Sequence, residues 1–302
     1  MSITATILLL ISAFTHAGWN FISKKEHPTQ AFYLVANTIG VICVLPILCF
    51  YWNVIPLIPR SVWIIAVMSG FFLAAYLQAL AGAYRTGDIS IAYPMARALP
   101  VIFVFFFTLI LGKGQMLGSW FVLGAILIVG GCIILPIQAF GEFNLSNYKN
   151  PCCFLAVLAA VCIAGYTVAD DIALRYLREI PGKPFNSVEG PLVYMVLEGI
   201  SCSLWQSVFV MFSSRERQSM TDVLQSYKRS SAMTGIGIYL TYGLVLVSMN
   251  YVTNVSYVAA FRQLSIPLGA LLGMALLKEP RYPPKIIGVV IVFLGLVLVS
   301  MG

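Results

Sequence analysis

Ten apolar stretches, each long enough to cross a bilayer, fill almost all of this chain. An α-helix of about 20 residues spans a hydrocarbon core of about 30 Å, and a helix satisfies its own backbone there. Only 10% of the 302 residues are charged, against about 25% in soluble proteins. We therefore predict an all-α integral membrane protein with ten transmembrane helices, over residues 3–22, 31–52, 61–83, 89–111, 116–138, 152–174, 189–213, 232–251, 255–277 and 284–301.

The second five stretches repeat features of the first five in the same order. AFTHAGWN, from residue 13, aligns with AVCIAGYT, from residue 160. The fourth and ninth stretches each carry an arginine before a proline, and the fifth and tenth each carry two glycines seven residues apart. We predict two five-helix repeats, residues 1–140 and 152–302, joined by a linker over 141–151. Because five is odd, the second repeat would enter the membrane from the opposite side, as in inverted-repeat transporters.

Loop charges give an orientation. Loops on the side of the termini carry five Lys or Arg residues and those on the other side carry eleven. The positive-inside rule then places both termini outside the cytoplasm. One of the longer connections, 214–231, is rich in charge and is predicted to be a solvated surface loop.

Four segments resemble the EamA-type branch of the drug/metabolite transporter superfamily, and the resemblance covers the whole chain. They are HAGWN followed by Lys24, YPMARALP from Tyr93, FRQLSIPLGALLGMALLKEP from Phe261 and GVVIVFLG from Gly288. The resemblance implies a ten-helix carrier of small metabolites with cytoplasmic termini, opposite to the charge count. The family often has a Leu-x-Glu element after helices 4 and 9. Here the second copy is Leu277–Glu279, whereas the first, at 111–113, lacks the glutamate.

Two arginines lie deep in the predicted spans. Arg97 is about eight residues into its helix, or about 12 Å by helix rise, and Arg262 is its counterpart. A charge at this depth is costly unless it faces water or a partner. Either the arginines coordinate an anionic group in a pathway bent by the nearby prolines, or each pairs with an internal carboxylate as a structural lock. Inversion of the repeat predicts that they lie in opposite halves of the membrane.

The remaining candidate site residues follow from this arrangement. Lys24 is expected beside Arg97, where the two would attract an anion at one mouth. Three acids, Asp170, Asp171 and Glu198, are expected near Arg262 as coupling or gating residues, and a cavity-facing Glu198 could carry a proton. Polar and aromatic residues would complete the substrate site: His16, Trp19, Asn20, Tyr76, Tyr93, Tyr166, Tyr257 and Gln263.

These features favour a secondary-active transporter that moves a small anionic or zwitterionic metabolite by alternating access. A flippase for a lipid-linked anionic head group is the alternative, and an integral membrane enzyme or a structural subunit is a third reading. The chain has no GxxxxGK[ST] phosphate loop and no His/Cys set with metal spacing, so no catalytic residue, cofactor or metal is expected. Expected partners are the solute, the lipid bilayer and protons, without nucleic acid. The protein is expected in the cell (inner or plasma) membrane as a multi-pass monomer or homodimer.

Overall fold

The computed structural model describes residues 3–110, 119–141, 148–182, 185, 188–249, 251 and 261–301. This part of the chain is helical and has no β-strand. Its elements are α1 (Ile3–Lys25), α2 (Gln30–Val44), α3 (Pro46–Phe50), the 3-10 helix η1 (Ile55–Leu57), α4 (Arg60–Thr86), α5 (Ile89–Ala98), α6 (Pro100–Ile110), α7 (Ser119–Ile134), α8 (Pro151–Arg178), α9 (Glu189–Met211), α10 (Ser214–Asp222), the π-helix η3 (Val223–Tyr227), α11 (Lys228–Met249), α13 (Ser265–Leu276) and α14 (Pro283–Met301).

Eight helical segments within the described residues are long and apolar enough to cross a membrane. They coincide with eight of the predicted stretches, which confirms the prediction of an all-α protein with several membrane-spanning helices. The shorter apolar helices α7 and α13 occupy the fifth and ninth stretches, and the remainder of those two stretches falls partly outside the described residues.

Two helical stretches are interrupted just after an arginine. The fourth stretch divides into α5 and α6 at Leu99, because Pro100 has no N–H to continue the helix. Near the other arginine, Phe261 and Arg262 are helical, and α13 begins after a turn, at Ser265. Breaks of this kind are tolerated at membrane depth where they are buried in protein or line a cavity.

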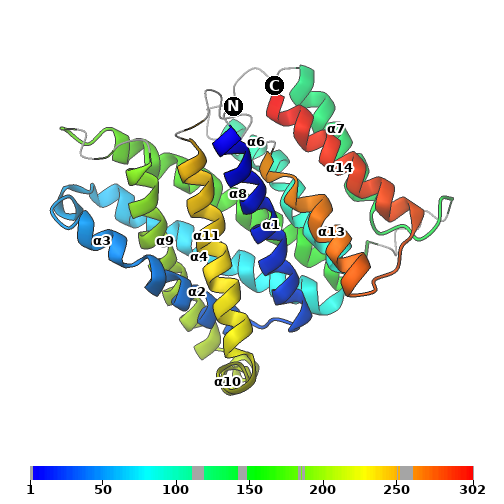
Figure 1. Ribbon diagram of the computed structural model, residues 1–302, viewed down its shortest axis with the longest axis horizontal. Helices are drawn as coiled ribbons and strands as arrows, with labels where there is room; N and C mark the ends of the chain where they lie inside the picture. Colours follow the sequence, from blue (N-terminus) through cyan, green and yellow to red (C-terminus); the bar gives the residue numbers. More distant parts are fainter. Residues whose placement is uncertain are drawn as a thin grey trace.

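Most of the long helices pack against helices from the other half of the sequence (Figure 1). Helix α4 packs against α8 and α9, and α11 packs against α1 and α2. Helix α5 lies between α8 and α13, while α7 pairs with α14 at one edge of the bundle. The start of α1 and the end of α14 lie at the same end of the molecule in Figure 1.

The segment 214–231 is helical and not a loop as predicted, although most of its residues are exposed. Helix α10 lies across the end of the bundle and passes through η3 into α11 (Figure 1). Ser213 Oγ accepts a hydrogen bond from Glu216 N at the start of α10. Glu216 is buried, and its carboxylate accepts a hydrogen bond of 3.1 Å from the backbone N–H of Ala31 in α2. Charge in the sequence suggested a solvated loop, but this acid caps a helix N-terminus instead.

Charged residues also fix the start of α5. Glu279, after α13, accepts hydrogen bonds from the backbone N–H groups of Ile89 and Ser90, at 2.7 and 3.0 Å. The glutamate of the second Leu-x-Glu element therefore caps the N-terminus of α5. Beside it, the buried Lys285 forms an ion pair of 2.7 Å with Asp88, the residue that precedes α5. The start of α5, which leads to Arg97, is therefore held by residues of the last two helical stretches.

Helices α7 and α14 approach closely through glycines. A Cβ atom added to Gly124 would lie 2.6 Å from the carbonyl oxygen of Gly295, and one added to Gly131 would lie 2.9 Å from that of Gly288. Small residues permit such backbone contact between membrane helices. The glycine pairs that the sequence placed seven residues apart thus face each other across this crossing.

Gly131→Ala should destabilise the protein by about 1–3 kcal/mol, because the added methyl forces the two backbones apart. Gly130 supplies the matched control, since nothing lies within 4 Å of a Cβ atom added there. Thermal unfolding in detergent should show a lower Tm for Gly131→Ala and an unchanged or higher Tm for Gly130→Ala. Equal Tm values for the two variants would contradict the close crossing.

Candidate functional site

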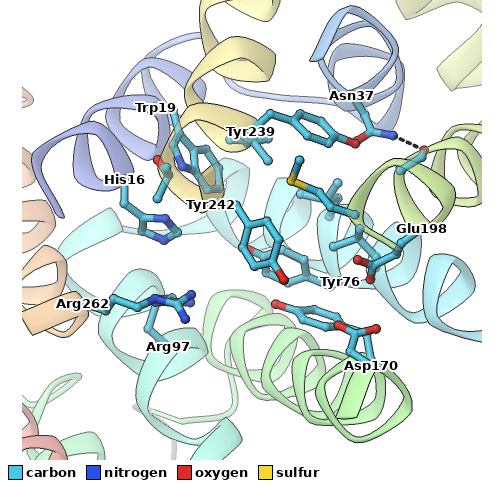
Figure 2. A pocket seen from close by; sticks show the side chains of 17 residues that line it. His16, Trp19, Asn37, Tyr76, Arg97, Asp170, Glu198, Tyr239, Tyr242 and Arg262 are labelled. Atoms are coloured by element: carbon cyan, nitrogen blue, oxygen red, sulfur yellow. Dashed lines mark hydrogen bonds between the residues drawn. The ribbon is translucent and has the colours of Figure 1, made fainter. Parts of the chain in front are cut away.

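A cavity of about 170 Å³ lies between helices from both halves of the sequence. This volume has room for a small solute or several water molecules. The lining is His16 and Trp19 from α1, Asn37 from α2, Leu73, Tyr76 and Leu77 from α4, Arg97 from α5, Tyr166 and Asp170 from α8, Met195, Glu198 and Gly199 from α9, Ile238, Tyr239, Thr241 and Tyr242 from α11, and Arg262. Figure 2 shows the two arginines at one end and the two carboxyl groups at the other.

The cationic end brings Arg97 and Arg262 together. Their guanidinium groups lie at the same end of the cavity in Figure 2, and each residue is half-buried. Within the described residues, no carboxylate lies within 4.0 Å of either arginine. The Nε atom of Arg97 is buried with no hydrogen-bond partner. Two like charges in one cavity repel each other, and an anionic group between them would offset that repulsion.

Other polar atoms near the arginines also lack partners. The Nε2 atom of His16, the Nε1 atom of Trp19 and the hydroxyl of Tyr93 are buried without a hydrogen-bond partner in the described part of the chain. The His16 ring lies 5.1 Å from that of Trp19 and 6.0 Å from that of Tyr93, measured between centroids. Buried polar atoms are nearly always satisfied in native proteins, so this group is an unusual concentration of unmet hydrogen bonds.

At the acidic end, one hydroxyl joins two carboxyl groups. Ser69 Oγ lies 2.5 Å from Asp170 Oδ1 and 2.8 Å from Glu198 Oε1. The hydroxyl of Tyr194 donates a further hydrogen bond of 3.1 Å to Asp170. A serine hydroxyl has one proton to donate, so both Ser69 contacts are hydrogen bonds only if one carboxyl group is protonated and donates back to Ser69. The pair therefore has the geometry of a site that holds one proton.

Asn37, Tyr239 and Thr241 are among the lining residues that were not predicted from the sequence. Asn37 donates to Gly199 O at 3.0 Å and to Ser203 at 2.8 Å, and it accepts a hydrogen bond of 2.9 Å from Tyr239. This network ties α2, α9 and α11 together along one wall. An asparagine in an otherwise apolar stretch was the signal that could have identified the wall, because lipid excludes such side chains.

The two arginines, which the sequence assigns to opposite halves of the membrane, nevertheless share one cavity. In the predicted spans each lies about 12 Å along its helix, and the midplane of a core of about 30 Å lies at about 15 Å. Inversion therefore separates the two residues by only about 6 Å along the membrane normal. Long arginine side chains can close that distance.

The structure places several other predicted residues away from the cavity. Lys24 donates hydrogen bonds to the carbonyl oxygens of Tyr84 and Gly87 at the end of α4, so it does not join Arg97 at an anion site. Asp171 is exposed and forms an ion pair of 2.8 Å with Arg175, not with Arg262. Cations commonly bind the carbonyl groups that a helix leaves free at its C-terminus, which explains the position of Lys24.

The remaining predicted residues fall into three groups. Asn20 bonds to the carbonyl oxygen of His16 and to the hydroxyl of Tyr84, so it packs behind the cavity wall. Tyr93 and Gln263 also lie outside the lining, although Gln263 Oε1 is buried without a partner in the described part of the chain. Tyr257 lies outside the described residues.

Comparison with known proteins supports the fold but gives no information about family or function. No family model matches the chain, and no curated protein is significantly similar to it in sequence. A solved structure described only as "Crystal structure of protein" is 17% identical and superposes with a TM-score of 0.52. The match covers 99% of this chain and 98% of that chain. At this identity, the likeness shows that the two chains share a fold and shows nothing about function.

Proposed function

We propose that this protein is a secondary-active transporter that moves a small anionic or zwitterionic metabolite by alternating access. The observation that carries this proposal is the meeting of Arg97 and Arg262, without carboxylate partners in the described residues, in one cavity between apolar helices. A structural lock would pair each arginine with an acid. Two unpaired guanidinium groups are instead suited to bind an anionic group that enters the cavity.

The helix packing supports two inverted five-helix repeats. If α1, α2, α4, α5 and α7 correspond to α8, α9, α11, α13 and α14, the pairing of α4 with α8 becomes that of α11 with α1. In the same way, α4 with α9 becomes α11 with α2, and α5 with α8 becomes α13 with α1. The pairs α5–α13 and α7–α14 map onto themselves. Substrate sites of inverted-repeat transporters lie at the repeat interface near the midplane, which is the position we propose for this cavity.

We further propose that the transporter belongs to the EamA-type branch of the drug/metabolite transporter superfamily and that it uses protons. The proposal of proton coupling rests on Asp170 and Glu198, which border the cavity and share the hydroxyl of Ser69. A proton held there would be exposed to whichever side the cavity faces. Alternating access could then couple its movement to that of the solute.

The test is transport by the purified protein in proteoliposomes. Metabolites that raise its Tm should be taken up by counterflow, and an imposed pH gradient should alter that uptake. A fluorescent-lipid assay on the same vesicles measures flipping of anionic head groups. Lipid flipping without solute uptake would replace this proposal with the flippase, and the absence of both activities would contradict transport altogether.

A further inference from the structure

The two arginines at one end of the cavity offer only hydrogen-bond donors. In the described part of the chain, neither the guanidinium group of Arg97 nor that of Arg262 has an ion-pair partner, and Arg97 Nε is buried without an acceptor. A guanidinium group has five N–H donors and no acceptor. A group bound here would need acceptor atoms and negative charge.

The opposite end offers acceptors. Asp170 and Glu198 use the oxygens Oδ1 and Oε1 in their contacts with Ser69 and Tyr194. Their second oxygens, Oδ2 and Oε2, have no hydrogen-bond partner among the residues that the structure describes. Both side chains line the cavity. A group bound here would need N–H donors and positive charge.

Trp19 is an independent sign that the cavity receives a ligand. Its side chain lines the cavity and is only 4% exposed, yet its Nε1–H has no acceptor in the described residues. In Figure 2 it lies at the side of the cavity where His16 and the arginines are found. An acceptor group of a solute held by the arginines could satisfy this donor as well.

Aromatic side chains separate the two ends. Tyr242 lies between the arginines and the carboxyl groups in Figure 2. The rings of Tyr76 and Tyr166 lie 6.1 Å apart between centroids and line the same wall. Such rings favour contact with apolar carbon atoms, so the middle of the cavity suits the body of a solute and its ends suit opposite charges.

We propose that the solute is a dipolar ion whose anionic group binds at Arg97 and Arg262 and whose cationic amino group binds at Asp170 and Glu198. This inference rests on the proposed transport function and narrows its substrate class. A simple anion would leave the second oxygens of the carboxyl groups without donors, and a simple cation would leave the arginines without acceptors. A compact dipolar ion satisfies both ends, with its apolar body against the tyrosines.

The experiment measures ligand-induced changes in Tm of the purified full-length protein. The probes are the standard α-amino acids and the ω-amino acids from β-alanine to 6-aminohexanoate. Each is compared with the carboxylic acid that lacks its amino group and with the amine that lacks its carboxylate. At least one dipolar compound should bind the wild type roughly tenfold or more tightly than either of its matched partners.

The double variant Asp170→Asn/Glu198→Gln should remove the advantage of the amino group, so that the matched acid binds at least as well as the amino acid. Asp171→Asn, at the adjacent exposed carboxylate, should keep the wild-type preference and serves as the control. If the double variant does not fold, Glu198→Gln alone should reduce the preference.

Three results would overturn this inference: no dipolar compound binds, a matched acid binds the wild type equally well, or the preference survives in the variant. A matched acid that binds and is taken up would still support transport, whereas the transport proposal itself fails only if no solute crosses the membrane.

Discussion

Replacing Arg97 or Arg262 with alanine should abolish solute uptake while leaving the protein folded. Neither guanidinium group forms an ion pair within the described residues, so its removal breaks no ion pair there. Each substitution would remove charge-assisted hydrogen bonds to the solute, and each such bond contributes about 1.5–3 kcal/mol. Two such bonds correspond to at least about a hundredfold loss in uptake at low solute concentration. Counterflow in proteoliposomes measures this loss.

Two further variants sharpen the arginine test. Arg97→Lys keeps the charge but not the planar pair of donors, so we expect partial recovery. Arg178→Ala, at an exposed arginine outside the cavity, should transport like the wild type. The binding role fails if both alanine variants retain uptake. A strong fall in Tm for either of them would instead indicate that the arginine has a structural role.

Breaking the buried ion pair at the start of α5 should lower stability strongly. The loss of stability should depend on which of the two partners is replaced. Asp88→Asn leaves Lys285, which is 1% exposed, without its carboxylate and with the Pro280 carbonyl oxygen as its remaining hydrogen-bond partner. An uncompensated buried charge costs about 3–5 kcal/mol. Lys285→Met should cost less, about 1–2 kcal/mol, because the Asp88 side chain is 32% exposed and water can reach it.

The double variant Asp88→Asn/Lys285→Met is the control for this pair. It leaves no unpaired charge, so its Tm in detergent should lie above that of Asp88→Asn alone. If Asp88→Asn proves no less stable than Lys285→Met, the ion pair does not hold α5 as the structure indicates. Uptake should fall together with stability, because α5 leads directly to Arg97.

The predicted spans matched the observed helices best where a long apolar run left no alternative. A bilayer excludes unpaired backbone groups, so residues 61–83 and 152–174 had to form helices, and they lie within α4 and α8. The segment 214–231 was missed because a mixture of charged and polar residues is compatible with either a loop or a short helix. Its helix forms where Glu216 reaches the N-terminus of α2, which is a contact between residues 185 positions apart.

Eight of the predicted site residues line the cavity, including both arginines, Asp170 and Glu198. They were identifiable because polar side chains in apolar spans are expensive and so face the interior of the bundle. Lys24 and Asp171 were wrongly assigned to the site, because the cost of a charge within an apolar span does not apply to them. Both lie near helix ends, where a charge can bind carbonyl groups or remain in solvent without entering a shared site.

By itself, the sequence determined the class of the protein and most of its helices, and it predicted the depth of each charged residue because helix rise converts residue number into distance along a helix. Only the tertiary structure decided which residues at similar depth meet. That choice depends on how helix surfaces fit together sideways, through contacts such as Gly124 with Gly295, which follow no local pattern in the sequence. Packing therefore brought Arg97 and Arg262 to one end of a single cavity and the carboxyl groups to its other end.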